Sequence, residues 1–425
     1  MRIIFNFPQQ KFSLLKSQKA RKKIESCEMS LNFAKKYASR AIFLYHTTQN
    51  KNTSFKLFLS TQNFLCGNRN GLQLSYNFQW AKSYQTISSI NLEKSNIIRS
   101  PCKELMLPDN VALPEFVWEE GIKHHPDKLA LVNGVTGKSY TYKEGNEDCK
   151  KFAISLETLG IKKGDVVALF MPNCPEYILC LLGIAGIGAI TTTINPNYTP
   201  HEVSKQFEAS NCKIVVTIPS LTDIAKEAID KKNCNVTIII IDEDDVTGDS
   251  NYPTYQKLIG KVSNYEANEF KFQSDNWDEV ALLPYSSGTT GMPKGVMLTT
   301  KNLVSNIYQN VYGKELDFIK HATDSFQSKI ICVLPMFHIF GLFVTSMPTL
   351  RAGGQVITIP KFEPNLFANT LKKFKPTFLH LVPPLVAFCA NNETVTSNHL
   401  DSVEHIMVHF CSFICENLFG YYLWN

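Results

Sequence analysis

The residues with the clearest chemical potential form one loop at 284–296, Pro-Tyr-Ser-Ser-Gly-Thr-Thr-Gly-Met-Pro-Lys-Gly-Val. An apolar lead-in, residues 280–283, predicts a short buried strand before it. Glycines let the backbone turn tightly and bring its N–H groups close to a ligand. The hydroxyl groups add hydrogen-bond donors, and Lys294 adds a compact positive charge. This combination indicates a loop that holds a polyphosphate, and we call it the phosphate loop.

The spacing excludes a Walker A motif, which needs Gly, four residues and then Gly-Lys-Ser/Thr. Composition alone fits a polar surface loop equally well, because Gly, Ser and Thr are common loop residues. The order of the residues favours phosphate binding. The run Tyr-Ser-Ser-Gly-Thr-Thr-Gly-x-Pro-Lys-Gly-Val precedes a predicted helix at 301–313 and resembles the signature loop of the adenylate-forming (AMP-binding) superfamily. That superfamily contains acyl-CoA synthetases, 4-coumarate–CoA ligases and beetle luciferases.

The resemblance implies that this loop contacts the β- and γ-phosphates of ATP, with Mg²⁺ neutralising their charge. The residues so implicated are Ser286, Ser287, Gly288, Thr289, Thr290, Gly291 and Lys294.

A second motif, Pro-Met-Phe-His-Ile-Phe-Gly-Leu at 335–342, follows a predicted strand at 330–334. Ligands of open α/β sheets lie beyond the carboxyl ends of the strands. A single histidine in an apolar segment is more often a packed core residue, but the whole segment resembles the superfamily's second core motif. The resemblance implies that His338 is a catalytic-site residue beside the acyl group, and that Ile339, Phe340 and Gly341 line the acyl pocket with it. Related ligases of phenolic acids often have Tyr at the position of Phe340, so Phe favours a more apolar acid.

Lys361 follows a predicted strand at 355–359. An exposed lysine at a strand end needs no function, whereas the resemblance places Lys361 where it contacts the phosphates of CoA. Both interpretations stay open.

With 425 residues and 44% hydrophobic composition, the chain can bury a large core, in more than one subdomain. The first 92 residues contain 14 Lys and Arg but only two acidic residues, Glu25 and Glu28, while the rest of the chain is net acidic. Nucleic acid is therefore not an expected partner of the chain beyond residue 92.

Twelve cysteines lack paired spacing, which fits a reducing compartment. The longest apolar run, 178–190, is too short to cross a bilayer.

Three segments are expected. Residues 1–95 have the basic composition of a transit peptide and predict mitochondrial import, although an unstructured leader or an artefact of gene prediction fits equally well. A peroxisomal location of a full-length form and a cytoplasmic location are the alternatives. Residues 96–407 form a partial N-terminal adenylation domain, and 408–425 are a tail outside the resemblance. His405, His409, Cys411 and Cys415 match none of the common zinc spacings, so no protein metal site is predicted.

Between these ends, apolar strands alternate with helices, which predicts parallel sheets covered on both faces. The expected fold is the α/β large N-terminal domain of adenylate-forming enzymes, with doubly wound sheets, incomplete at its C-terminus. The predicted helices span 113–123, 142–160, 175–186 and 222–232, besides 301–313. Further strands are predicted at 165–171, 213–217 and 236–241, with a hairpin over 128–142.

The resemblance implies an ATP-dependent acid–thiol ligase, in which a carboxylic acid becomes an acyl-adenylate and is then transferred to CoA. It ends near residue 407, before the superfamily's adenine-binding segment, ribose-binding Asp, hinge and C-terminal domain. The chain as given is therefore expected to be inactive or nearly so. A luciferase-like monooxygenase and a non-catalytic nucleotide-binding fragment are the alternatives. The sequence does not identify the acid.

Overall fold

The computed structural model describes residues 2–6, 42–49, 52–59, 106–232, 235–242, 252–273, 276–286, 294–313 and 319–409. Most of the predicted leader, the centre of the phosphate loop at 287–293 and the tail from 410 onward lie outside the described residues. Cys411 and Cys415 lie there too.

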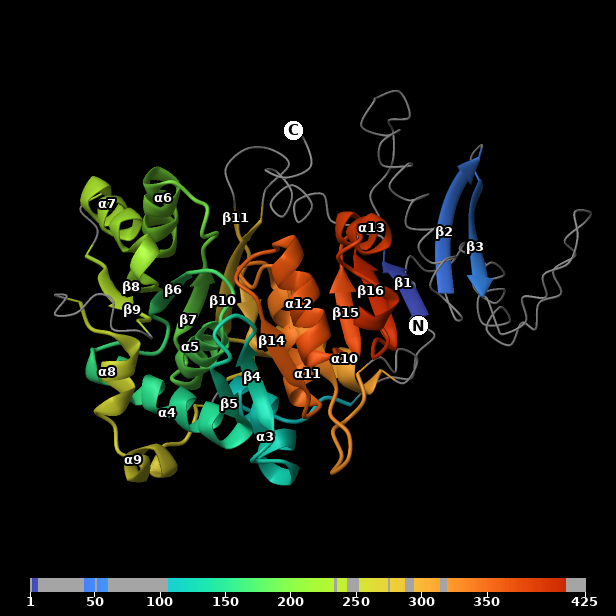
Figure 1. Cartoon of the computed structure of the whole chain (residues 1–425). Coiled ribbons are helices and arrows are strands. Elements are labelled where there is room, and N and C mark those ends of the chain that lie inside the picture. Colours follow the sequence, from blue (N-terminus) through green and yellow to red (C-terminus); the bar gives the residue numbers. More distant parts are fainter. Residues whose placement is uncertain are drawn as a thin grey trace, which may run out of the picture.

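The described body is built on two largely parallel sheets (Figure 1). The first sheet runs, in spatial order, through β1 (Arg2–Asn6), β16 (His405–His409), β15 (Phe378–Leu381), β13 (Lys329–Cys332), β14 (Gln355–Thr358), β4 (Leu129–Asn133) and β5 (Ser139–Thr141). Among these strands only β5 is antiparallel to its neighbour, because it forms the predicted hairpin with β4. A separate antiparallel pair joins β2 (Ile42–Gln49) to β3 (Asn52–Leu59).

The second sheet contains the strand that leads into the phosphate loop. Its order is β11 (Lys294–Gly295), β10 (Val280–Ser286), β7 (Ile190–Thr193), β6 (Val166–Phe170), β8 (Cys212–Thr217) and β9 (Thr237–Ile240), and β12 (Leu298–Thr299) also pairs with β10. The strands from β10 to β9 are parallel, whereas β11 and β12 run antiparallel to β10.

Helices cover both faces of the second sheet. Ala168 and Phe170 of β6 pack in the cluster that contains residues of α6 (Pro200–Ser210) and α7 (Thr222–Lys232). Val167 and Leu169 belong instead to the main core, which includes α4 (Tyr142–Thr158) and α5 (Pro175–Gly186). Successive side chains of a strand point to opposite faces, so a wholly apolar strand can serve two layers. The predicted doubly wound α/β fold is thus confirmed.

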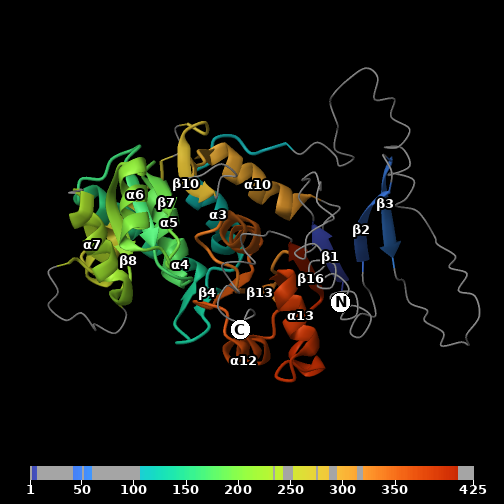
Figure 2. The same ribbon diagram turned by 90° about the horizontal axis from the view of Figure 1, so that it is seen from above.

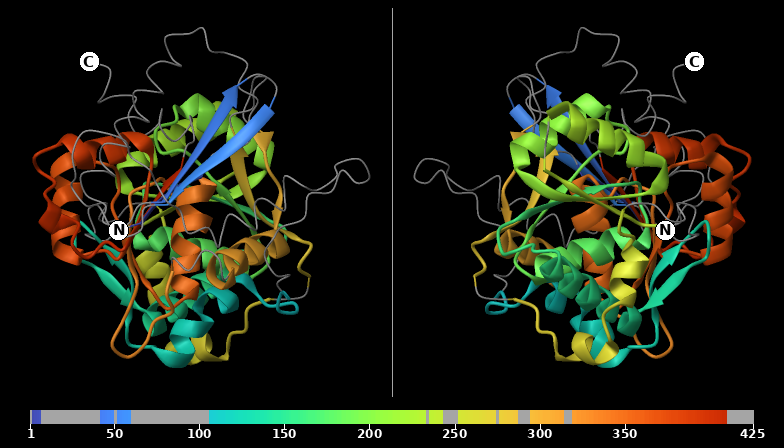
Figure 3. Two further views of the ribbon diagram at one scale, coloured as in Figure 1. Left: turned by 90° about the vertical axis from the view of Figure 1, so that its right-hand side faces the viewer. Right: turned by 90° about the vertical axis from the view of Figure 1, so that its left-hand side faces the viewer.

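The two sheets share one core, because α5 contacts β6 and β7 of the second sheet and β4 of the first. Helix α4 packs on α5 and contacts β4 and β5. Around this core lie α3 (Leu113–His124), α10 (Thr300–Tyr312) and α11 (Met347–Arg351). Figure 2 shows α10 on one side of the first sheet and α12 (Pro364–Phe374) and α13 (Pro383–Asn391) on the other. The short helices α8 (Tyr255–Gly260) and α9 (Asn264–Glu269) pack on α4. Figure 3 views the structure from its two ends, with the region of one sheet behind that of the other.

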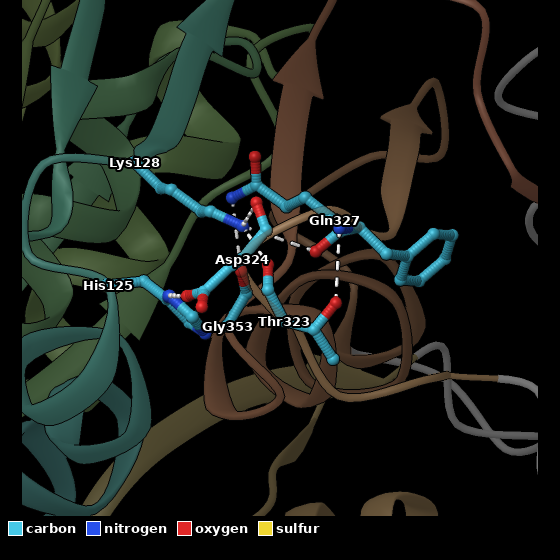
Figure 4. A network of polar contacts seen from close by, with 7 residues as sticks. His125, Lys128, Thr323, Asp324, Gln327 and Gly353 are labelled. Atoms are coloured by element: carbon cyan, nitrogen blue, oxygen red, sulfur yellow. Dashed lines mark hydrogen bonds and ion pairs between the residues drawn. The ribbon is translucent and has the colours of Figure 1, made fainter.

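A network of hydrogen bonds holds the chain in place just before β13 (Figure 4). The Lys128 ammonium group donates to the carbonyl oxygens of Thr323, Asp324 (3.4 Å) and Phe326 (3.3 Å). The Gln327 side chain donates to two further backbone carbonyl groups, at 2.8 and 3.0 Å. The turn before β13 is thereby fastened to the start of β4, and the opposite end of β13 leads to His338.

Candidate active site

The phosphate loop connects the ends of a short antiparallel hairpin. Ser286, the last residue of β10, lies opposite Lys294, the first residue of β11, and both are exposed. Opposed residues of an antiparallel pair project on the same face. The structure therefore brings Ser286 and Lys294 together at the carboxyl end of β10. Five further predicted phosphate ligands lie outside the described residues, namely Ser287, Gly288, Thr289, Thr290 and Gly291.

Strand β7 links this hairpin strand to the second motif. The Thr192 hydroxyl donates to the Leu283 carbonyl oxygen of β10 at 2.9 Å. Thr193 is aligned with Pro284 in the parallel ladder, and its hydroxyl donates to the Phe337 carbonyl oxygen at 2.8 Å. One strand thus contacts both the entrance of the phosphate loop and the residue before His338.

The chain between β13 and His338, residues 332–338, is the His338 segment. Asn173, which is 6% exposed and follows β6, makes three hydrogen bonds to it. Its amide nitrogen donates to the carbonyl oxygens of Cys332 (3.2 Å) and Leu334 (2.9 Å), and its amide oxygen accepts from the Met336 N–H (2.7 Å). Buried backbone N–H and C=O groups beyond the end of a strand need hydrogen-bond partners of this kind. Here the second sheet supplies them to a segment of the first.

His338 is partly buried, and a backbone group two residues further along the chain orients its ring. Its Nδ1 accepts from the Phe340 N–H at 3.2 Å, which in the neutral imidazole leaves the proton on Nε2. Phe340 begins a π-helical turn, η2 (Phe340–Ser346), that continues into α11. A Cβ atom at Gly341 would lie 2.3 Å from the Pro335 carbonyl oxygen and 2.7 Å from that of Leu334. The turn therefore needs glycine at this position.

The predicted acyl-pocket residues differ in their surroundings. Phe340 is 5% exposed, and its ring packs edge-to-face on His380, with 5.3 Å between ring centroids. His380 Nδ1 lies 2.7 Å from the Thr345 hydroxyl oxygen. Ile339 is partly buried and packs against the main core. Acyl binding by these residues stays a prediction.

Cys332, at the end of β13, is not a nucleophile candidate. It is fully buried, and burial raises its pKa to about 12, so the thiol stays protonated at neutral pH.

Lys361 lies in the exposed turn between β14 and α12. Because β13 and β14 are adjacent and parallel, this turn and the His338 segment leave the same edge of the first sheet. The Glu363 carboxylate caps α12 by accepting from the N–H groups of Asn365 (3.1 Å) and Leu366 (2.6 Å). Contact of Lys361 with CoA stays a prediction.

Asn173 and Thr193, which hold the His338 segment, lie in neither of the two motifs that the sequence points to. The available signal was a polar side chain at or just beyond the end of a buried strand, which is where α/β sheets bind ligands.

Across the described ranges, no group of three or more His, Cys, Asp or Glu side chains could hold a metal ion. No helix within those ranges is long and apolar enough to span a bilayer.

The chain is similar in sequence to proteins of one enzyme family. The profile of the AMP-binding enzyme family matches residues 118–412. A relative, 4-coumarate–CoA ligase 3 of Arabidopsis thaliana, is 36% identical over 313 residues, which cover 73% of this chain and 53% of the relative. The chain therefore spans about half the length of the curated relatives it matches.

Solved structures share the fold of this chain. ATP-bound MatB from Rhodopseudomonas palustris superimposes with a TM-score of 0.58 at 25% identity, covering 70% of this chain and 55% of MatB. A natural red-emitting luciferase from Phrixothrix hirtus superimposes with a TM-score of 0.63 at 20% identity, covering 75% and 60%. The luciferase likeness supports the fold alone.

Proposed function

Because the chain belongs to the AMP-binding enzyme family, we propose that it carries the ATP-binding and acyl-binding part of an ATP-dependent acid–thiol ligase. In the proposed reaction a carboxylate attacks the α-phosphorus of ATP, giving an acyl-adenylate and pyrophosphate. The thiolate of CoA then attacks the acyl carbon and displaces AMP. The 36% identity to a 4-coumarate–CoA ligase supports this reaction class.

One observation carries the proposal. Thr192 and Thr193 of β7 bond to the strand that enters the phosphate loop and to the residue before His338, respectively. An anion site and an acyl site at this junction would hold ATP and the acid side by side. Such positioning turns a reaction of two molecules into one within a single complex.

Each predicted residue has a place in this scheme. Ser286 and Lys294, with the rest of the phosphate loop, would bind the β- and γ-phosphates of ATP. The Mg²⁺ ion would enter with ATP and be held mainly by phosphate oxygens and water, as is usual for this ion. His338 and the three residues after it would form one wall of the acyl pocket, and Lys361 would contact the phosphates of CoA.

We further propose that the 425-residue chain binds Mg-ATP through the phosphate loop. The chain covers 53% of its Arabidopsis relative, so the activity itself needs a direct test. Acyl-CoA formation by the purified chain would support the ligase reaction. Light emission with a luciferin would instead favour the monooxygenase alternative.

The test is Mg-ATP binding by isothermal titration calorimetry, with acid-dependent ATP–pyrophosphate exchange measured in parallel. Lys294→Ala should weaken ATP binding about tenfold or more, because a charge-assisted bond to a phosphate contributes roughly 1.5–3 kcal/mol. Lys301→Ala removes an exposed lysine from the start of α10 and is the matched control. Equal ATP affinity of the two variants would exclude Lys294 from phosphate binding. Absence of ATP binding by the unmodified chain would overturn the proposal itself.

A further inference from the structure

Three consecutive threonines of β7 are all buried but have different partners. Thr191 is 0% exposed, and its hydroxyl has no hydrogen-bond partner among the described residues. The Thr192 hydroxyl donates to Leu283 of β10 and accepts from the Gln206 side chain at 3.0 Å. Thr193 is 4% exposed, and its hydroxyl leaves its own sheet to reach the Phe337 carbonyl oxygen.

Thr193 is therefore bound on two sides. Its main chain lies in the ladder beside Pro284, two residues before Ser286. Its carbonyl oxygen also accepts from the Gln206 amide at 3.0 Å, which fixes the end of β7 against α6. Its side chain holds Phe337, the residue before His338. A shift of the His338 segment relative to the phosphate-loop strand would break this last bond.

Asn173 holds the rest of the same segment. Its three hydrogen bonds engage Cys332, Leu334 and Met336, and the Thr193 bond engages Phe337. Thr193 is the last residue of β7, and Asn173 lies just beyond the carboxyl end of the adjacent strand β6, in the sheet that also carries the phosphate loop. The His338 segment follows a strand of the first sheet, yet the second sheet determines its position.

We propose that Asn173 and Thr193 are positioning residues that set the location of His338 relative to the phosphate loop. The proposal rests on the proposed function in one respect, that His338 and the loop serve the same reaction. Neither residue needs to touch a substrate. Each acts by holding backbone groups, and small displacements of a reacting pair reduce rates strongly.

The first experiment measures backbone amide hydrogen exchange in the full chain without ligand. Thr193→Val keeps the shape of the side chain and removes the hydroxyl, so amide exchange in residues 336–342 should accelerate about five- to tenfold, the effect of one typical hydrogen bond. Thr193→Ser restores the donor and should return exchange to within about twofold of the original rate. Thr191→Val is the matched control on the same strand, because the hydroxyl it removes is unpaired, and it should leave these amides unchanged.

Equal exchange in Thr193→Val and Thr191→Val, or failure of Thr193→Ser to restore protection, would overturn the inference. The second experiment titrates Mg-ATP into the same variants, and we expect affinities within about twofold of one another. If the unmodified chain fails to bind ATP while the exchange pattern holds, the proposed function fails and the structural coupling stands. If ATP binds normally but the exchange pattern is absent, only the positioning role fails.

Discussion

Two neighbouring strands of the first sheet, β13 and β14, lead to predicted site residues in very different surroundings. After β13, the His338 segment is held by Asn173 and Thr193 from the other sheet and is closed by a turn that requires Gly341. After β14, the chain enters an exposed turn that contains Lys361. The position of His338 therefore depends on contacts between the sheets, whereas Lys361 depends only on its own turn. Substitutions in the first region should change stability and geometry, and those in the second only charge.

The largest effect should come from Gly341→Ala. The added methyl group would lie 2.3 and 2.7 Å from two backbone carbonyl oxygens, which cannot move as a side chain can. Forcing atoms into a packed site typically costs 1–3 kcal/mol, and we expect about 3 kcal/mol here. The measurement is the free energy of unfolding in urea. In the control, Gly260→Ala, the added Cβ meets nothing within 4 Å at the end of α8, so the variant should be neutral or more stable by up to about 1 kcal/mol. Similar values for both variants would mean that the turn after β13 is no more constrained than an open surface position.

Asn173→Ala should follow, with a loss of about 2–3 kcal/mol. It leaves the buried Met336 N–H group without its partner, which costs roughly 1–3 kcal/mol, and it removes the shorter hydrogen bonds of the Cys332 and Leu334 carbonyl oxygens. Those two oxygens keep only longer contacts, with the Ile359 N–H group (3.4 Å) and the Cys332 thiol (3.5 Å). Asn369→Ala, at an exposed position of α12, is the control and should be neutral or slightly stabilising, since alanine favours helix. A neutral Asn173→Ala would show that the first sheet alone holds the His338 segment.

Burial also distinguishes two carboxyl groups, Asp148 and Asp165, whose pKa values shift in opposite directions. Burial raises the pKa of Asp148 on α4 to about 6, with Glu147 and Glu144 adding to the rise and Lys151 and Lys138 opposing it. The folded state then holds its proton more firmly than the unfolded state, so stability falls as pH rises from about 4 to about 6 and stays constant above. Asp148→Asn should stabilise the protein by about 1–2 kcal/mol at pH 7 and have little effect at pH 4.

Asp165 provides the opposite sign. Burial acts to raise its pKa, but the hydrogen bond and charge of Lys213, at 2.6 Å, lower it overall. Asp165→Asn should therefore destabilise the protein at pH 7, and the loss should vanish as pH falls through the folded pKa. Thermal unfolding of both variants across this pH range is the measurement. The same pH trend in both would contradict the assignment of the Asp148 shift to burial.

Much of the fold followed from local sequence pattern. Helices α5 and α7 have the predicted bounds, because a proline at the first turn or an amphipathic run marks them clearly. Several helices were not predicted, and two of these, α6 and α12, have clear start signals in the sequence. Thr199 and Glu202 form a reciprocal capping box at α6, and Glu363 caps α12 ahead of Pro364. The capping patterns at these two positions were therefore available signals in the sequence.

The site was only partly predictable for a different reason. The phosphate loop and His338 could be predicted as site residues because each lies within one short motif. Asn173 and Thr193 act on backbone groups 159–163 and 144 positions away in the chain. No local pattern records which strands become neighbours, so a contact of this kind becomes visible only when both sheets are in place.

The smallest effect should come from Lys361→Ala. Its exposed side chain contributes little to folding, so the unfolding free energy should change by less than about 0.5 kcal/mol. If the side chain contacts the phosphates of CoA, affinity for CoA should fall about three- to fivefold at low salt, and the difference should shrink as salt screens exposed charges. Lys372→Ala, at an exposed position of α12, removes the same charge and is the control. Equal CoA affinity in the two variants would exclude the contact. A loss of stability as large as that of Asn173→Ala would instead break the comparison, because the turn after β14 would then be as firmly held as the segment after β13.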